Sequence, residues 1–425
     1  MSHVVIIGGG FGGLYAARTL KGAPVQVTLI DRRNFHLFQP LLYQVATGWL
    51  SPADIASPLR AVLKRQRNVQ VLLAEATDID VANRRVILTD GEVSYDTLIV
   101  ATGARHHYFG NTQWEQFAPG LKTIEDATEI RRRILFAFEA AERETDPERM
   151  RSWLTFVIVG GGPTGVELAG TLGELTKDTL RHNFRHINPT ESRILLVEGT
   201  DRILPAYPAE LSAKAAAALA RLGVSVRTGA TVTDVQSDAV ILRSNEQSEQ
   251  LATRTVIWAA GVQASPLGRI LATATGAELD RAGRVMVAPD LSVPGRPDIF
   301  VIGDLAHYRN QHGQPLPGVA PVAMQQGHYV AEVIRHRLRG QTPPPFHYRD
   351  RGNMAIVGRA EAVADIKGWR FSGLLAWLAW LFIHLIQLVE FENRLLVLIQ
   401  WAWNYFSRNR SARLITGEPP SRSSP

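Results

Sequence analysis

The chain has 425 residues, of which 45% are hydrophobic and 20% are charged, a composition typical of a folded protein with two or three domains. It contains no cysteine, which excludes disulfide bonds, thiolate metal sites, Cys-x-x-Cys redox pairs and a cysteine nucleophile. The formal net charge of +6 suits an anionic surface, but the arginines are spread along the chain, so nucleic-acid binding is not expected.

The sequence begins with an apolar β-branched run, residues 4–7, that leads directly into a glycine-rich motif. It shows no basic segment followed by an apolar stretch, as a secretory signal would, so we expect a cytoplasmic catalytic body. Gly8, Gly10 and Gly13 have the spacing that allows a tight turn, close approach to a pyrophosphate and helix packing on the strand. The next strand ends in Asp31, where a ribose-binding carboxylate belongs. This predicts a dinucleotide-binding fold, with a glycine-rich turn in another α/β protein as the alternative.

The following segments extend this fold. Residues 34–44 mix aromatic and polar side chains at the sheet edge where ligands bind. Ala101, Thr102 and Gly103 follow an apolar strand and form a small-residue turn that a cofactor can approach. The elements expected up to this point are a helix at residues 12–20, strands at 25–30, 69–73, 85–88 and 97–100, a short basic surface helix at 58–67, and an exposed charged helix linking two units at 126–149.

The opening motif then occurs a second time. An apolar strand at residues 155–159 leads into Gly160, Gly162 and Gly165, and the next strand ends in Glu198. One fold for FAD and one for a nicotinamide nucleotide explain the repetition, with an internal duplication that leaves one fold empty as the alternative.

The acid of the second motif predicts which nucleotide binds. A carboxylate such as Glu198 accepts a hydrogen bond from a free ribose 2′-hydroxyl and repels a 2′-phosphate, which favours NADH over NADPH. Arg202 lies nearby and would weaken this preference.

Later strands lead back to the first fold. Ala260 and Gly261 follow one strand, and Gly303 and Asp304 follow another, where the acid can hold a polyol hydroxyl or cap a turn. Pro321 marks the first turn of a helix whose positive end would stabilise negative charge on a reduced flavin. The expected strands are residues 224–227, 231–235, 239–242, 255–258, 285–287 and 299–302.

Together these motifs resemble the two-dinucleotide-binding-domain flavoproteins, and among them the type II (non-proton-pumping) NADH:quinone oxidoreductases. The resemblance covers nearly the whole chain and rests on Gly8 to Gly13, Phe38 to Tyr43, Ala101 to Gly103, Gly160 to Glu167, Gly303–Asp304 and the helix at Pro321. It implies an α/β fold of two Rossmann-like domains, the FAD domain discontinuous and the NADH domain inserted, plus C-terminal amphipathic membrane-binding helices. The expected domains are an FAD-binding domain at residues 1–115 and 291–365, a linker helix and NADH-binding domain at 116–290, membrane-associated helices at 366–415 and a disordered tail at 416–425.

The resemblance also implies which residues hold the nucleotides. Those expected to contact FAD are Gly8, Gly10, Phe11, Gly12, Gly13, Asp31, Arg32, Pro40, Leu41, Ala101, Thr102, Gly103, Gly303, Asp304, Ala320, Pro321 and Val322. Those expected to contact the substrate NADH are Gly160, Gly162, Pro163, Thr164, Gly165, Glu167, Glu198, Ala260 and Gly261.

Two residues are expected to be catalytic. The resemblance places Glu167 between the nicotinamide and quinone sites, where it handles hydride or protons, although a carboxylate in a first helical turn is also stabilised by the helix dipole. The family's quinone motif is similar to Ala-Gln-x-Ala-x-Gln, and here Pro321 replaces its first Gln while Gln325 remains.

The acceptor would be a membrane quinone, either menaquinone or ubiquinone. Its expected contacts are Ala320, Gln325, Gln326, Lys367 and His384. A solvated side chain for Lys367 and a hydrogen-bonded interface residue for His384 are the alternatives. No metal site is expected, because the histidines are scattered.

The C-terminal region is apolar enough to reach a membrane. Residues 371–389 are long enough for a span, but His384 and Gln387 share a helical stripe with two tryptophans and would not be left in lipid. A second apolar segment, residues 395–406, is followed by arginines that suit anionic headgroups, namely Arg408, Arg410 and Arg413. We therefore expect two helices lying on the cytoplasmic face of the membrane, with a single span or a buried dimer interface as alternatives. A homodimer is possible, and the Pro- and Ser-rich tail from Gly417 should be disordered.

The expected function is FAD-dependent oxidation of NADH with two-electron reduction of a membrane quinone. The alternatives are an NADH-dependent reductase of a ferredoxin-like carrier and a non-enzymatic flavin redox sensor. Sulfide:quinone oxidoreductases and dithiol–disulfide flavoenzymes are rejected, because they need cysteines near the flavin.

Overall fold

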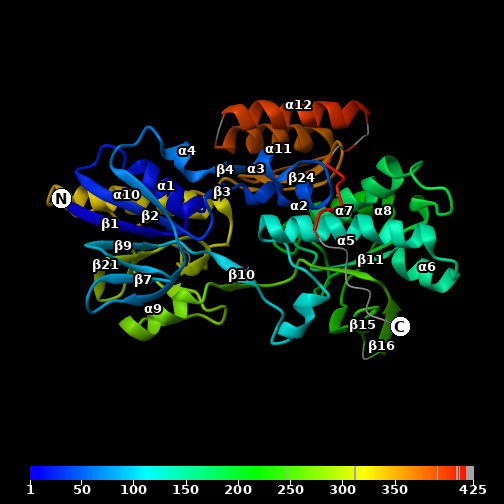
Figure 1. The fold of residues 1–425 in the computed structure, drawn as a ribbon, viewed down its shortest axis with the longest axis horizontal. Helices are drawn as coiled ribbons and strands as arrows, with labels where there is room; N and C mark the ends of the chain where they lie inside the picture. Colours follow the sequence, from blue (N-terminus) through cyan, green and yellow to red (C-terminus); the bar gives the residue numbers. More distant parts are fainter. Residues whose placement is uncertain (246, 311–312, 390, 408–409, 411, 418–425) are drawn as a thin grey trace. The chain divides into compact units, whose positions relative to one another are not determined.

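The computed structural model describes residues 1–245, 247–310, 313–389, 391–407, 410 and 412–417, so Arg408 and all of the expected disordered tail after Gly417 lie outside the described residues. The chain forms two compact units (Figure 1). The first unit comprises Met1–Leu37, Ala56–Arg105 and Val262–Asp350, and the second comprises Phe38–Ile55, His106–Gly261 and the chain from Arg351 onward.

The first unit is built around a six-stranded sheet in the order β20-β21-β9-β1-β2-β5, in which only the edge pair β20–β21 is antiparallel. The central strand is apolar and β-branched, and its residues Val4, Val5 and Ile6 are fully buried. The strands are β1 (Ser2–Ile7), β2 (Val25–Asp31), β5 (Val69–Leu73), β9 (Thr97–Val100), β20 (Ser292–Val293) and β21 (Arg296–Val301).

Two helices of this unit pack backbone to backbone. A Cβ on Gly327 of α10 (Ala320–Leu338) would lie 2.2 Å from the carbonyl oxygen of Gly12 in α1 (Phe11–Thr19), so only a glycine allows this approach. The smaller elements are β3 (Phe35–Leu37), β4 (Ala56–Pro58), α4 (Leu59–Leu63), β6 (Ala76–Asp80), β7 (Arg85–Leu88), β8 (Gly91–Ser94), β10 (Ala104–His106), β18 (Val262–Ala264), α9 (Leu267–Thr275), β19 (Val285–Met286) and β22 (Ala306–His307).

The second unit contains a four-stranded parallel sheet in the order β13-β12-β11-β17. Its strands are β11 (Thr155–Val159), β12 (Arg193–Val197), β13 (Val224–Arg227) and β17 (Thr255–Trp258). Helix α7 (Pro163–Glu174) follows β11 and meets β23 (Asn353–Gly358) so closely that a Cβ on Gly170 would lie 1.6 Å from the carbonyl oxygen of Val357. A segment from late in the sequence therefore packs directly on the second glycine-motif helix.

The remaining elements of the second unit cover these layers. Two antiparallel three-stranded sheets are formed by β14 (Thr231–Val235), β15 (Ala239–Ser244) and β16 (Gln247–Ala252), and by β23, β24 (Glu361–Ile366) and β25 (Trp369–Ser372). The helices are α2 (Leu42–Ala46), α3 (Pro52–Ile55), α5 (Ile124–Arg143), α6 (Pro147–Trp153), α8 (Ala209–Arg221), α11 (Leu374–Gln387) and α12 (Phe391–Ser407), with a π-helical turn over Leu175–Thr179. Short 3₁₀ turns occur at Gln39–Leu41, Thr112–Gln116, Pro189–Glu191 and, in the first unit, Gly303–Leu305.

The expected exposed linker helix at residues 126–149 is wrong in two respects. The chain forms two helices there, α5 and α6, separated by the N-cap Asp146 and Pro147. One face of α5 is buried, including Ile134 and Phe138, because its charged residues other than the buried Arg131 lie outside that face. The basic helix at 58–67 is shorter than expected, since α4 ends at Leu63.

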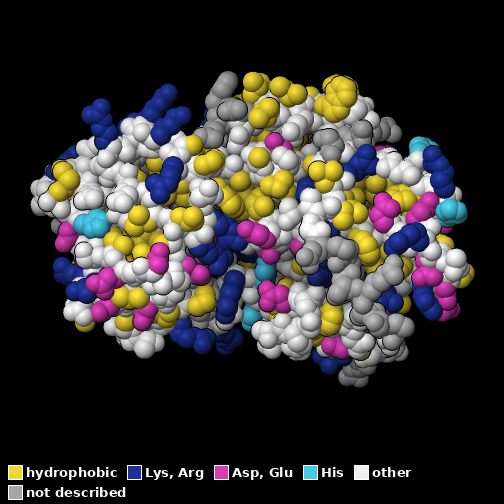
Figure 2. Space-filling model, in the orientation of Figure 1, with side chains coloured by type: hydrophobic (Ala, Val, Ile, Leu, Met, Phe, Trp, Pro, Cys, Tyr) yellow, Lys and Arg dark blue, Asp and Glu magenta, His cyan; other side chains and the backbone are white. Residues whose placement is uncertain are grey.

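Helices α11 and α12 carry an exposed apolar face, which gathers over both helices in Figure 2. Leu375 is 71% exposed and Phe406 is 83% exposed. The other members of this apolar face are Leu374, Leu378, Phe382, Ile386, Leu395, Leu396, Leu398, Ile399 and Trp403. The opposite side faces protein, with Trp380 and Trp401 buried. Across the described residues, no helix is both long and apolar enough to cross a membrane.

Candidate nucleotide and quinone sites

The first glycine motif forms an open cradle between β1 and α1. Gly8 has φ +104°, and a Cβ there would lie 2.4 Å from the carbonyl oxygen of Ala101, while a Cβ on Gly13 would lie 1.8 Å from that of Gly8. Gly10 is the N-cap of α1 without a side-chain cap, and no atom lies within 4 Å of where its Cβ would be. Uncapped amides at a helix N-terminus beside open space fit a pyrophosphate.

Asp31 closes this cradle at the end of β2. Its two carboxylate oxygens accept the backbone N–H of Gly9 at 2.6 Å and that of Arg33 at 2.7 Å. Burial raises the pKa of Asp31, and these two N–H groups oppose that shift. The carboxylate therefore fixes the glycine loop, and it stands where the sequence predicted a ribose-binding acid.

The second glycine motif has the same construction. Gly160 has φ +108°, and a Cβ on Gly165 would lie 1.8 Å from the carbonyl oxygen of Gly160. Gly162 again faces open space and begins α7 without a side-chain cap. Glu198 accepts the N–H of Gly161 at 2.6 Å and that of Thr200 at 2.8 Å, as Asp31 does in the first unit. Pro163 and Thr164 begin α7, and Ala260 and Gly261 follow β17. Two equivalent cradles each fit one dinucleotide.

The other residues predicted for FAD are divided between the units. Ala101, Thr102 and Gly103 follow β9, Arg32 follows β2, and Ala320, Pro321 and Val322 begin α10, which has no side-chain cap. Gly303 has φ +72°, and its N–H donates to Oε1 of Gln326 at 2.7 Å. Pro40 and Leu41 belong to the second unit. The buried amide of Gln326 thus supports the turn before Asp304, and its oxygen already has a partner within the protein.

The residues predicted for the quinone lie in both units. Gln325, in the first, pairs its amide with the backbone of Arg349, donating to its oxygen and accepting its N–H at 3.0 Å each. In the second unit, Lys367 is exposed in the turn between β24 and β25. His384 of α11 is half-buried, and its Nδ1 lies 2.8 Å from the carbonyl oxygen of Trp380. Burial lowers the pKa of His384 to about 4, so its imidazole is neutral.

Glu167 lies on α7, packed among α2 and the C-terminal sheet. The surrounding protein removes its carboxyl from water and raises its pKa well above the ordinary value, while the N–H of Ile356 acts in the opposite direction. The same desolvation, together with the charge of Glu167, raises the pKa of Tyr43 and of Tyr207. Burial therefore favours the protonated form of Glu167, and its charge acts on the phenols of Tyr43 and Tyr207.

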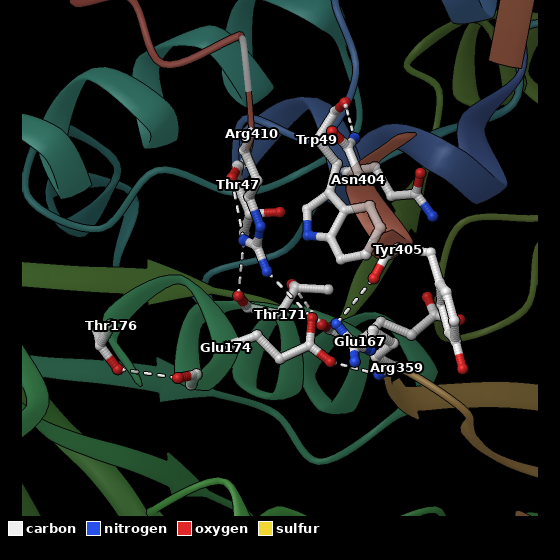
Figure 3. Close-up of polar contacts among 12 residues, drawn as sticks. Thr47, Trp49, Glu167, Thr171, Glu174, Thr176, Arg359, Asn404, Tyr405 and Arg410 are labelled. Carbon is white, nitrogen blue, oxygen red and sulfur yellow. Dashed lines mark hydrogen bonds and ion pairs between the residues drawn. The ribbon is translucent and has the colours of Figure 1, made fainter. Parts of the chain in front are cut away.

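The sequence did not reveal the network drawn in Figure 3. Arg410 is 2% exposed and donates to Glu174 at 3.1 Å, to the carbonyl of Thr171 at 2.9 Å and to that of Thr47 at 3.2 Å. Its guanidinium stacks over Trp49 at 4.8 Å from the ring centroid. Burial lowers the pKa of Arg410 to about 10, and Glu174 opposes this shift. The expectation that Arg410 meets lipid headgroups is therefore wrong.

A second arginine completes the network. Arg359 donates its backbone N–H to Glu174, and its guanidinium donates to the carbonyl of Tyr405 at 3.0 Å while lying over that ring. The network thus ties α12 and the residues after it to α7 (Figure 3). No local pattern could have found it, because its members are far apart in sequence.

Comparison with known proteins identifies the family. A family model described as pyridine nucleotide-disulphide oxidoreductase matches residues 2–327, and one described as the NDH2 C-terminal domain matches residues 351–409. The type II NADH:quinone oxidoreductases Ndh and NdhA of Mycobacterium tuberculosis are 48% and 46% identical, and each match covers 98% of this chain and 90% of the mycobacterial protein. The structure of NDH2 from Plasmodium falciparum in complex with NADH has the same fold, with a TM-score of 0.89 at 21% identity over 97% of this chain and 99% of that one. The chain belongs to the family of type II NADH:quinone oxidoreductases.

Proposed function

We propose that the chain uses FAD to oxidise NADH and reduce a membrane quinone, with the first glycine cradle holding FAD and the second holding NADH. The observation that carries this assignment is the equivalent construction of the two cradles, each with an uncapped helix N-terminus and an acid that fixes the glycine loop. The absence of cysteine leaves no dithiol to accept electrons in the chain itself.

The chemistry that FAD supplies when bound is acceptance of a hydride from NADH and delivery of two electrons to the quinone. The residues of this chain bind and orient the reactants. We assign the FAD pyrophosphate to the amides at the start of α1, its ribose to Asp31 and its polyol chain to Asp304. The uncapped start of α10 adds positive potential for negative charge on the flavin.

In the second cradle we assign the NADH pyrophosphate to the start of α7 and its adenosine ribose to Glu198. The carboxylate of Glu198 repels a 2′-phosphate, so NADH is preferred to NADPH. Arg202 lies near this carboxylate in sequence, but its guanidinium donates to the carbonyl of Pro205 at 3.2 Å.

On the quinone side we assign proton handling to Glu167, because reduction of a quinone takes up two protons and burial raises the pKa of this carboxyl, which favours its proton-carrying form. Gln325 and His384 are the proposed polar contacts to the quinone head. A neutral imidazole whose Nδ1 donates to a carbonyl offers Nε2 as an acceptor for a hydroxyl of the reduced quinone. Lys367 stands at an exposed turn and completes the set as a cation for the quinone oxygen.

The exposed apolar face of α11 and α12 is proposed to lie in the headgroup region at the cytoplasmic face of the membrane, where a lipid-soluble quinone is available. Co-sedimentation with anionic vesicles tests this. Phe382→Glu should abolish vesicle binding and leave NADH-dependent flavin reduction in detergent unchanged. Dimerisation through this face without vesicle binding would assign it to a second copy instead.

Anaerobic stopped-flow absorbance tests the function. NADH should bleach the flavin band, and a short-chain quinone added afterwards should restore it rapidly. Fast reduction without recovery by any quinone would refute the quinone assignment and favour a protein acceptor or a redox sensor. Glu167→Gln should slow the recovery more than the reduction.

A further inference from the structure

A buried chain of hydrogen bonds connects the C-terminal helix to α2. Nε1 of Trp401 in α12 donates to Oε1 of Gln44 at 2.8 Å, and Nε2 of Gln44 donates to the hydroxyl oxygen of Tyr43 at 3.0 Å. Each of the three residues is at most 5% exposed. All three belong to the second unit, and the proposed site needs none of them for binding a nucleotide.

Donor and acceptor chemistry fixes the direction of this chain. An indole nitrogen can only donate, so the atom of Gln44 that faces Trp401 must be its oxygen. The amide nitrogen of Gln44 therefore faces Tyr43 and donates to it. A phenol has one hydrogen, and its oxygen already accepts here, so the hydrogen of Tyr43 points away from Gln44. Trp401 thus determines where the hydroxyl hydrogen of Tyr43 is available.

Glu167 lies on α7, the helix that packs against α2, which carries this phenol. Burial has the largest effect on the pKa of Tyr43 and raises it, and the charge of Glu167 raises it further. The other charged groups that act on Tyr43 are Glu174, also on α7, and Arg410, which follows α12; Tyr207 is the second phenol affected by Glu167. A carboxylate formed at this desolvated position requires a hydrogen-bond donor to stabilise its charge.

We propose that Trp401 and Gln44 are positioning residues for quinone reduction, holding the hydroxyl hydrogen of Tyr43 towards the carboxyl of Glu167. The inference rests on the proposed function. Glu167 gives its proton to one oxygen of the quinone as two electrons from NADH arrive there, so an O–H bond forms on the quinone and one breaks on Glu167. The other quinone oxygen takes the second proton from water. The carboxylate left behind accepts the hydrogen bond of Tyr43 until a proton from water restores the carboxyl. The helix bearing the exposed apolar face therefore supports the proton donor.

The test measures flavin reoxidation by a short-chain quinone after anaerobic reduction, across pH. Trp401→Phe keeps an aromatic side chain and removes the indole N–H, so Gln44 can turn its oxygen to Tyr43 and divert the hydroxyl hydrogen. Reoxidation should slow about tenfold, the loss of roughly one hydrogen bond to a charged group. The pH at which reoxidation falls off should rise, because the carboxylate loses its donor. Flavin reduction by NADH should be unchanged.

Two further variants keep the result interpretable. Trp114→Phe is the matched control, since the buried Trp114 also loses one indole hydrogen bond, to Asp234 at 3.2 Å, and both the rate and the pH profile should stay as in the wild type. In the double variant of Tyr43→Phe with Trp401→Phe, the second change should add nothing to the first, because both act through one hydroxyl.

The outcomes separate the two proposals. If the wild-type flavin is not reoxidised by quinone, the proposed function fails. If it is reoxidised, and Trp401→Phe reacts at the wild-type rate or slows equally at every pH without moving the inflection, the role of Trp401 is structural and the inference is overturned. Additive losses in the double variant would overturn it as well.

Discussion

Replacing Arg410 with Met removes the cation of a fully buried ion pair and leaves its partner in place. Glu174, 5% exposed, would keep only the N–H of Arg359, and the carbonyls of Thr47 and Thr171 would each lose a donor. Breaking such a pair by removing one partner costs about 3–5 kcal/mol, because an uncompensated buried charge remains. We therefore expect Arg410→Met to be among the most destabilising single changes in the second unit.

Thermal unfolding followed by circular dichroism checks this. In a domain of about 150–250 residues, each kcal/mol of lost stability lowers the unfolding midpoint by about 2–4 °C, so the midpoint should fall by about 10 °C. Arg410→Met combined with Glu174→Gln should recover about 2 kcal/mol, since the amide still accepts the N–H of Arg359 and no charge is left unpaired. A loss under about 1 kcal/mol for the single variant, or no recovery in the double variant, would show that the pair does not act as described.

Three other predictions address the cradles and the acid response. Burial lowers the pKa of His36 to about 4, so between pH 6.5 and 4 the unfolded chain binds a proton that the folded chain does not, and stability falls as the pH drops through this window. Between pH 7 and pH 5, the free energy of unfolding should therefore fall by about 2 kcal/mol more in the wild type than in His36→Gln, as measured by urea unfolding at each pH. An equal fall in both proteins would contradict this. Gly10→Ala should fold normally, but its affinity for FAD should fall more than tenfold, because the added methyl group enters the open cradle. Gly91→Ala, which also places its methyl group in open space, should keep full flavin content. Glu198→Gln should reduce the ratio of kcat/KM for NADH over NADPH about tenfold in steady-state assays, and an unchanged ratio would remove the assigned role of the charge.

The parallel strands and both glycine motifs could be predicted from the sequence because their signals are local. The strands β11 and β17 begin and end at the expected residues, since a strand covered on both faces reads as an uninterrupted apolar run. Strand β16 was missed because it is polar and exposed and is defined by its antiparallel partner β15.

The environment of single charges could not be predicted in this way. Arg410 follows a stretch of aromatic residues, and nothing in that stretch distinguishes a headgroup contact from a buried ion pair with a distant partner. Likewise, the buried face of α5 depends on what packs there, while the sequence shows mainly its charged face. Burial and pairing are properties of the fold, so they appear only once the chain is folded.

The ion pair between Glu174 and Arg410 also constrains the order in which the protein can mature during synthesis. Arg410 is made 236 residues after Glu174, and the strand that packs on Gly170 is made nearly as late. On a ribosome adding about 5–20 residues per second, the second glycine-motif helix must wait for more than ten seconds with its acid unpaired and its glycine face uncovered. A nascent chain stalled before residue 410 would therefore expose the face of α7 that carries Gly170 and Glu174. A chaperone would have its greatest effect on the yield of folded protein in this interval.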